Sequence, residues 1–176
     1  MTESPTIVGE KVRLRQFSVS DAPEIFKLID SNREHLSQHD DETAGKYPRL
    51  EKVVDSIENP NPRRTRFAIR NEEGKYIGSI NFERLQNHPD IAEVGYYMDK
   101  EETGKGYTTD ALKTLTEYAF TEKDIRLLFA LVHPDNKASG KVLSKAGYSY
   151  VRDEVLPATE LHDNLVFQRY EKRKVK

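Results

Sequence analysis

The junction between residues 97 and 108 constrains the fold of this chain more than any other stretch. It reads YMDKEETGKGYT and passes from an apolar strand pattern through a glycine-containing loop to a helix pattern. The first N–H groups of a helix lack internal partners and carry partial positive charge, so they favour anions. Gly104 and Gly106 allow close backbone approach to a phosphate, and Lys105 adds a positive charge. The junction predicts a phosphate-binding loop, although a plain strand-to-helix turn would use glycine similarly.

Spacing excludes two common phosphate loops. A Walker loop needs a glycine with four residues between it and the Gly-Lys pair, and Asp99 occupies that place. A dinucleotide-binding loop needs a third glycine three residues after the second, where this chain has Thr109. The loop also lies past mid-chain, whereas dinucleotide loops usually come early. The phosphate ligand must therefore belong to another class.

Composition and charge fit one soluble domain. The chain has 176 residues, 28 Lys plus Arg, 30 Asp plus Glu and a formal net charge of -2, so it lacks the basic surplus of a nucleic-acid binder. It has no cysteine, which excludes disulfides, thiolate metal sites and a cysteine nucleophile. Residues 1–10 lack the regions of a signal peptide, and no apolar run reaches membrane-spanning length. We expect a cytoplasmic protein that binds neither nucleic acid nor membrane.

Hydrophobic periodicity predicts an α/β layered sheet with the order β-α-α-β-β-β-α-β-α-β-β. Strand patterns cover residues 11–15, 65–70, 76–85, 91–98, 126–132, 148–155 and 161–170. Helix patterns follow a Ser20-Asp21 cap and cover 50–57, 106–121 and 136–146. Residues 31–48 are polar and irregular, and we expect one domain over 1–176 with a short flexible tail over about 171–176.

Three further segments accompany the glycine loop. The strand before it reads AEVGYYM over 92–98, and downstream the chain carries VHPDNKAS over 132–139 and VLSKAGY over 142–148. In this order the segments resemble the GNAT superfamily of acyl-CoA-dependent N-acyltransferases, over about residues 8–170. Within it, the chain is similar to the subgroup that includes ribosomal-protein N-terminal (alanine/serine) acetyltransferases. The resemblance implies a mixed, mostly antiparallel sheet with a parallel splayed strand pair and flanking helices. It also implies a homodimer.

The resemblance assigns a set of residues to the co-substrate acetyl-CoA. The loop backbone would bind the pyrophosphate, and the pantetheine arm would lie where strands 91–98 and 126–132 splay apart. The residues assigned to the cofactor are Tyr97, Met98, Asp99, Glu102, Thr103, Gly104, Lys105, Gly106, Tyr107, Thr108 and Asn136. Two residues depart from the family pattern: Glu101 replaces an Arg or Gln, and Thr103 replaces a bulkier side chain.

Glu93 is the predicted catalytic base. An amine that attacks a thioester must lose a proton, and a carboxylate takes it directly or through water. Alternation puts Glu93 on one strand face with Ile91, Gly95 and Tyr97, and apolar surroundings raise a carboxyl pKa. The alternative is a rim glutamate or one held in an ion pair.

Two further groups complete the expected chemistry. A free backbone N–H near Tyr97 or Met98, released by a bulge at Gly95, could stabilise the tetrahedral oxyanion. Many relatives protonate the leaving thiolate with a tyrosine seven residues after the asparagine, where this chain has Leu143. The subgroup instead carries a serine three residues after it, and Ser139 matches. Its alternative is a serine on the helix surface.

The acceptor stays open at this point. The hypotheses are a protein N-terminal α-amine, a small amine such as a polyamine, an amino acid or a drug, and a non-catalytic acyl-CoA-binding regulatory domain. His35 and His39 have the i, i+4 spacing of a helical metal pair, but no third ligand is evident, so we expect no metal.

Overall fold

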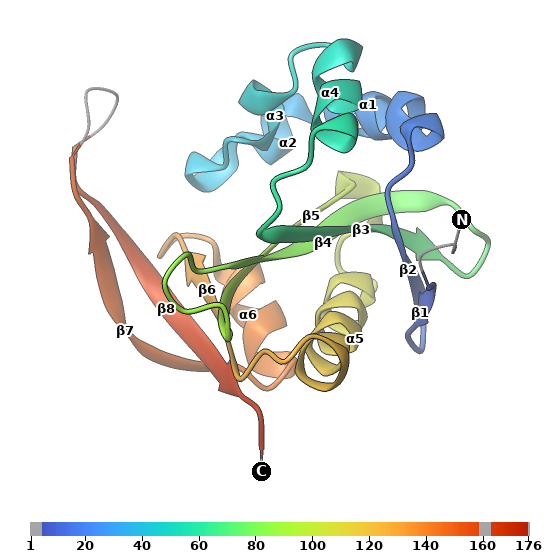
Figure 1. Ribbon diagram of the computed structural model, residues 1–176. Helices are drawn as coiled ribbons and strands as arrows, with labels where there is room; N and C mark the ends of the chain where they lie inside the picture. The colour runs from blue at the N-terminus through green and yellow to red at the C-terminus, as the bar shows by residue number, and fades with distance from the viewer. Residues whose placement is uncertain (1–4, 159–162, 176) are drawn as a thin grey trace.

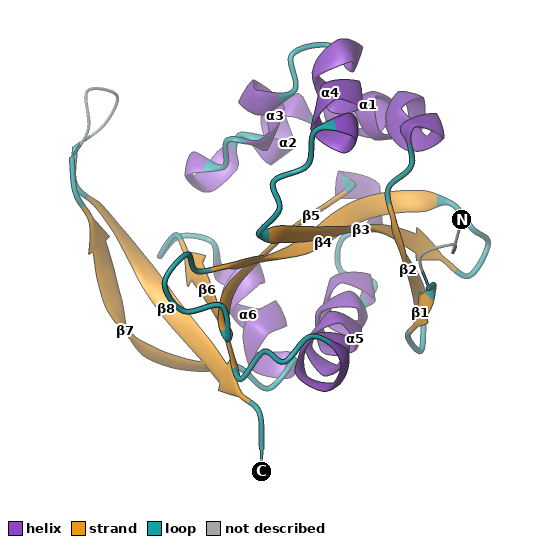
Figure 2. Ribbon diagram, in the orientation of Figure 1, coloured by secondary structure: helices purple, strands orange, loops and turns teal. Residues whose placement is uncertain are grey.

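The computed structural model describes residues 5–158 and 163–175, and its strands form one eight-stranded sheet (Figures 1 and 2). The strand order is β1-β2-β3-β4-β5-β6-β8-β7. The strands are β1 (Ile7–Val8), β2 (Val12–Gln16), β3 (Arg64–Asn71), β4 (Tyr76–Arg84), β5 (Ile91–Met98), β6 (Leu127–Val132), β7 (Ser149–Leu156) and β8 (Leu165–Arg173). The α-helices are α1 (Ala22–Ser31), α2 (Arg33–Leu36), α3 (Thr43–Lys46), α4 (Leu50–Glu58), α5 (Tyr107–Glu122) and α6 (Lys137–Lys145).

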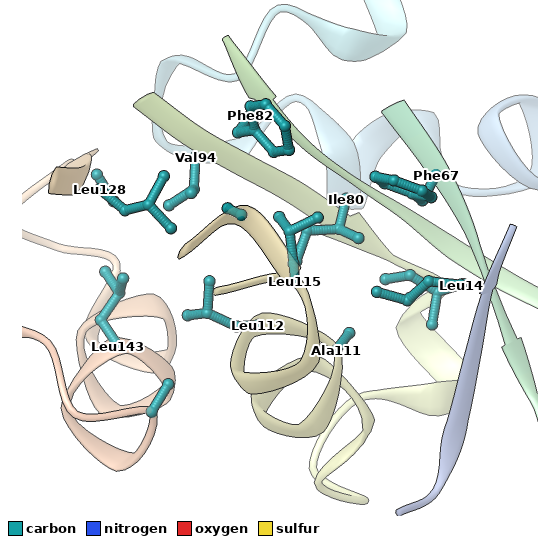
Figure 3. Close-up of a cluster of buried hydrophobic side chains, with 14 of the residues drawn as sticks. Leu14, Phe67, Ile80, Phe82, Val94, Ala111, Leu112, Leu115, Leu128 and Leu143 are labelled. Carbon is teal, nitrogen blue, oxygen red and sulfur yellow. The ribbon is translucent and has the colours of Figure 1, made fainter. Parts of the chain in front are cut away.

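Two helical layers enclose the sheet. Helices α1 to α4 lie over one face, whereas α5 and α6 lie over the other (Figure 1). On α5, Ala111, Leu112 and Leu115 recur at helical spacing and are fully buried. They pack with Leu14, Phe67, Ile80 and Phe82 of the sheet and with Leu143 of α6 in the larger core cluster (Figure 3). A smaller cluster lies under α1 to α4.

The pair β5–β6 is the parallel exception in an otherwise antiparallel sheet. Its pairing covers only Ile91–Glu93 of β5 and Leu127–Phe129 of β6. Beyond these three pairs both strands continue, β5 to Met98 and β6 to Val132, without bonding to each other. The mixed, mostly antiparallel sheet with a splayed parallel pair is therefore confirmed.

Three local features differ from, or add to, the predictions. Residues 31–48 are not irregular: they form α2, α3 and a one-turn helix over Gln38–Asp40 between them. Apolar residues do not recur at helical spacing in this polar segment, so hydrophobic periodicity did not predict these helices. Asp21, from the predicted Ser20-Asp21 signal, is the N-cap residue of α1, and Ser18 caps the single 3₁₀ turn Val19–Asp21 before it, with its N–H donating to the Asp21 carboxylate at 2.7 Å. Strand β1 was not predicted, because its two residues are too few to show an alternating pattern.

The expected flexible tail over 171–176 is also wrong in part. Strand β8 runs to Arg173 and pairs with both β6 and β7. Lys174 then donates its N–H to the Arg126 carbonyl at 2.9 Å. In the ranges that the structure describes, no helix has the length and apolarity to cross a membrane.

Asp110 in the first turn of α5 joins the amino-terminal strands to the helix. Its carboxylate accepts backbone N–H bonds from Glu10, Lys11 and Val12 at 3.2, 2.7 and 3.0 Å. The residue is only 9 % exposed, so these N–H groups would be poorly hydrated without it. The carboxylate also complements the positive end of the helix. Asp110 thereby fixes the start of α5, and with it the glycine loop that precedes the helix.

Replacing Asp110 with Ala should destabilise the fold. Because two or more N–H groups would lose their acceptor, we expect a loss of about 2 kcal/mol in the free energy of unfolding. The midpoint of thermal unfolding should fall by roughly 4–8 °C. Glu117→Ala, an exposed site on the same helix, is the matched control and should leave the midpoint nearly unchanged. Equal midpoints for both variants would contradict the role of Asp110.

Candidate active site

A cavity of about 580 Å³ lies where β5 and β6 part. Its wall includes both faces of β5, since Glu93 and Tyr96 both contribute to it. The predicted residues that line it are Glu93, Tyr97, Met98, Thr103, Gly104, Thr108, Asn136 and Ser139. The predicted residues outside the lining are Asp99, Glu102, Lys105, Gly106 and Tyr107. The structure thus brings both predicted catalytic residues and much of the predicted cofactor set to one cavity.

From Gly104 onward, the N–H groups of the glycine loop have no partner among the described residues. Gly104 and Gly106 have φ values of 77° and 85°, a region that side chains with a Cβ rarely adopt. The N–H of Glu102 donates to the Asp99 carbonyl, and that of Thr103 to the Lys100 carbonyl. The loop backbone can therefore offer an anion the N–H groups that follow, up to the first turn of α5. The N–H groups of Glu102 and Thr103 are thus engaged within the loop, and the assignment of these two residues to the cofactor stays a prediction.

The loop carries more positive charge than its sequence shows. Lys75 and Lys105 each place Nζ 2.8 Å from the carboxylate of Glu102, which lowers the pKa of that carboxyl. Lys11 donates to the Lys105 carbonyl at 3.2 Å. Two ammonium groups thus flank the Glu102 carboxylate, and a third, that of Lys11, lies at the backbone of the loop. The carboxylates of Asp99 and Glu101 also act on Lys75. Glu101, the departure from the family pattern, is exposed and stands outside these bonds.

Glu93 projects from the centre of the sheet into the cavity. Burial raises the pKa of its carboxyl, and the neighbouring Glu83 carboxylate raises it further. Glu83 itself is neutralised by Arg64 at 2.7 Å and Arg63 at 3.4 Å. No hydrogen bond or ion pair to the Glu93 carboxylate comes from the residues that the structure describes. Glu93 is therefore neither a rim glutamate nor part of an ion pair there.

Free backbone donors face the gap beside Glu93. Asp99 donates its N–H to the Ile77 carbonyl of β4, and alternation then points the N–H groups of Tyr96 and Met98 toward β6. These positions lie beyond the last β5–β6 pair. The expected bulge at Gly95 is wrong, because the β4–β5 register runs through it without a shift. The free donors arise from the parting of two strands.

The first turn of α6 forms the opposite wall. Asn136 caps this helix by accepting the Ser139 N–H at 3.1 Å, and its amide nitrogen remains a donor on the cavity wall. The Ser139 hydroxyl lies 2.7 Å from the hydroxyl of Tyr96. Ser139 is thus not an exposed serine of the helix surface. Leu143, where many relatives carry a tyrosine, is fully buried in the core.

Helices α2 to α4 close the cavity over the Glu93 face. Arg66 of β3 donates to the Tyr47 hydroxyl at 3.0 Å and to the Ser56 carbonyl in the last turn of α4 at 2.9 Å. These bonds hold the helices to the sheet. The His39 ring lies 5.7 Å from that of His133, at the end of β6. These contacts join residues far apart in sequence, so no local pattern could have found them.

His35 and His39 do not lie on one helix, so their i, i+4 spacing does not bring them together on a helix face. Helix α2 ends at Leu36, and His39 has a φ of 56°. Over residues 5–158 and 163–175, no group of three or more His, Cys, Asp or Glu side chains is placed to hold a metal ion.

Because Glu93 is buried, its contribution to the free energy of unfolding should fall as the pH rises. The folded chain holds the Glu93 proton more tightly than the unfolded chain, so stability from this residue is present at low pH and lost as pH rises through the raised pKa. Glu93→Gln should therefore match wild type near pH 4 and have the higher unfolding midpoint near pH 8, by about a few degrees. The exposed control Glu117→Gln should show no such trend. A Gln variant that is less stable near pH 8 would contradict this environment.

Comparison with known proteins bears on the chain as a whole. A family model described as an acetyltransferase (GNAT) domain matches residues 11–149. The chain is 29 % identical over 154 residues to Probable N-acetyltransferase YjcK of Bacillus subtilis, covering 80 % of this chain and 81 % of the relative. It is 29 % identical over 77 residues to the ribosomal-protein-serine acetyltransferase of Escherichia coli, covering 44 % and 43 %.

A solved structure shares the fold. RimL, a ribosomal L7/L12 alpha-N-protein acetyltransferase in complex with coenzyme A, superposes with a TM-score of 0.84 at 18 % identity, covering 96 % of this chain and 98 % of that one. At this identity the match shows the fold alone. The family match over most of the chain, with the parted strands and the glycine loop, shows that this protein belongs to the GNAT family of N-acetyltransferases.

Proposed function

We propose that this chain transfers an acetyl group from acetyl-CoA to a protein N-terminal α-amine by direct attack of the amine. The observation that carries the proposal is the unpaired carboxylate of Glu93 at the parting of β5 and β6. The relatives that act on ribosomal proteins support the choice of acceptor.

The loop and the strand edge divide the binding of acetyl-CoA between them. The free N–H groups from Gly104 to the first turn of α5, with the ammonium groups of Lys11 and Lys105 nearby, match a pyrophosphate. The unpaired edge of β5 at Tyr96 and Met98 offers N–H and C=O groups to the amides of the pantetheine arm. The amide nitrogen of Asn136 adds a donor from the opposite wall.

The residues around the gap match the steps of the transfer. Glu93 accepts a proton from the amine, directly or through a water, and its raised pKa makes it a better base near neutral pH than an ordinary glutamate. A free N–H of β5 at Tyr96 or Met98 stabilises the oxyanion. Ser139 bonds the thiolate that leaves. The chain has no cysteine, so the amine attacks without a thiol-bound acyl intermediate.

The charges of the cavity favour an acceptor with one amine. A polyamine carries several ammonium groups and needs several unpaired carboxylates, since buried charges must be paired. Glu83 is already neutralised by Arg63 and Arg64, so the carboxylates that remain in the lining, among the residues that the structure describes, are Glu93 at the gap and Asp41 among the helices. A chain N-terminus places one amine at the site, and one carboxylate suffices to accept its proton.

Turnover with a panel of acceptors tests the proposal. Purified protein is mixed with acetyl-CoA, a thiol-detecting reagent and one acceptor: a peptide with free N-terminal Ser or Ala, the same peptide blocked at its N-terminus, spermidine, or a free amino acid. We expect release of CoA with the free peptide, and at least a 100-fold lower kcat/KM for Glu93→Gln. Release with spermidine alone would contradict the acceptor, and full activity of Glu93→Gln would contradict the base.

The pH profile separates Glu93 from the acceptor amine. kcat/KM should rise with pH as Glu93 loses its proton, but the α-amine of the peptide also titrates. Removing the Glu83 charge in Glu83→Gln relieves a repulsion that raises the Glu93 pKa, so the acid limb should move to lower pH. The free peptide amine is the same in both assays. If the acid limb of the kcat/KM profile does not move in Glu83→Gln, the titrating group is the amine and not Glu93.

A further inference from the structure

The Tyr96 hydroxyl, which pairs with that of Ser139 on the cavity wall, has no part in the proposed transfer so far. Tyr96 reaches from β5 across the gap to α6, where its Oη lies 2.7 Å from Ser139 Oγ and 3.5 Å from the Ser139 carbonyl. Both residues line the cavity. The pair lies at the first turn of α6, beside the amide of Asn136 that caps it.

Either hydroxyl can donate across this 2.7 Å contact, and Tyr96 has a proton available to do so. Burial raises the pKa of Tyr96 to about 12, so its phenol keeps its proton throughout the neutral range. A serine hydroxyl has one hydrogen to donate and two lone pairs that accept. When Tyr96 donates to Ser139 Oγ, the Ser139 hydrogen is free to point elsewhere.

The Ser139 hydrogen has no competing acceptor on its own helix. Hydroxyls within a helix commonly donate back to a carbonyl one turn earlier. Thr114, Thr116 and Thr121 of α5 do so, at 2.8, 2.6 and 3.0 Å. In the part of the chain that the structure describes, the hydroxyl of Ser139 is bonded to Tyr96 and makes no such bond. Its hydrogen can turn into the cavity.

We propose that Tyr96 is a positioning residue for the leaving group: its O–H donates to Ser139 Oγ and directs the Ser139 hydrogen to the sulfur of coenzyme A. This inference rests on the proposed function and adds to it the group that orients Ser139. Two linked hydroxyls also polarise each other, which strengthens the bond to a developing anion.

The proton balance requires no ionised hydroxyl. The amine attacks the thioester carbonyl, the C–S bond breaks, and its electron pair goes to sulfur. An ammonium that becomes an amide loses two protons, of which one ends on sulfur and the other in solvent. Neither Tyr96 nor Ser139 loses its own proton, since a phenol of pKa about 12 is a weaker acid than a thiol. The pair stabilises the thiolate by hydrogen bonding.

The pKa of the bound CoA thiol is a direct readout that needs no acceptor. The chain has no cysteine, so the only thiol of the complex is that of CoA. The variants are Tyr96→Phe, Ser139→Ala and the double variant. We expect wild type to hold the thiol pKa below that of free CoA, and Tyr96→Phe to raise it by about one unit, a tenfold change. The double variant should match Ser139→Ala, because Tyr96 acts through Ser139.

Turnover gives the second readout. Tyr96→Phe should lower kcat about tenfold and leave the KM for acetyl-CoA nearly unchanged. Tyr148→Phe is the matched control: Tyr148 is 3 % exposed, and its hydroxyl lies 2.7 Å from that of Thr116, away from the cavity. It should affect the unfolding midpoint and not the thiol pKa.

The outcomes separate this inference from the acceptor assignment. If no amine is acetylated but wild type lowers the thiol pKa and Tyr96→Phe does not, the proposed acceptor fails and the Tyr96 role stands. A thiol pKa that is equal in wild type and Tyr96→Phe overturns the inference. Effects of Tyr96→Phe and Ser139→Ala that multiply in the double variant overturn it too, since they would show that Tyr96 only supports the wall.

Discussion

The parting of β5 and β6 after three residue pairs is the constraint on which the site depends. Each strand is held on its far side, β5 by antiparallel pairing with β4 and β6 by antiparallel pairing with β8. The two strands therefore cannot close on each other without breaking those ladders. The gap leaves strand donors unpaired, opens a cavity between two layers of helices, and lets Glu93 and Tyr96 line this cavity from opposite faces of β5.

The same unpaired groups that suit this gap to chemistry also lower the stability of the folded chain. A half-buried carboxylate without an ion pair and a strand edge without a partner are both unfavourable in a folded chain. Around the gap the remaining polar groups are satisfied: Arg63 and Arg64 neutralise Glu83, and Asn136 caps α6. Asp110 anchors the helix that follows the loop. Unpaired groups are thus concentrated where substrates would bind.

Sequence patterns located the elements of the site because those signals are local. The strand over Ile91–Met98 was predicted with its observed bounds, since its alternation is regular. Alternation also placed Glu93 and Tyr97 on one face, and the family motif led to Ser139. The contacts that complete the site join distant residues: Lys11 with Lys105, and Tyr96 with Ser139. The apolar residues of 31–48 do not recur at helical spacing, so α2 and α3, two of the helices that cover the cavity, were not predicted.

A crystal structure of the protein with coenzyme A tests the central claim most directly. The account predicts the pyrophosphate at the N–H groups of Gly104 to Thr108, the pantetheine arm along the unpaired edge of β5, and the sulfur within hydrogen-bond reach of Ser139 on the side of the gap that faces Glu93. Coenzyme A bound elsewhere, or a gap between β5 and β6 that stays empty at saturating ligand, would contradict it.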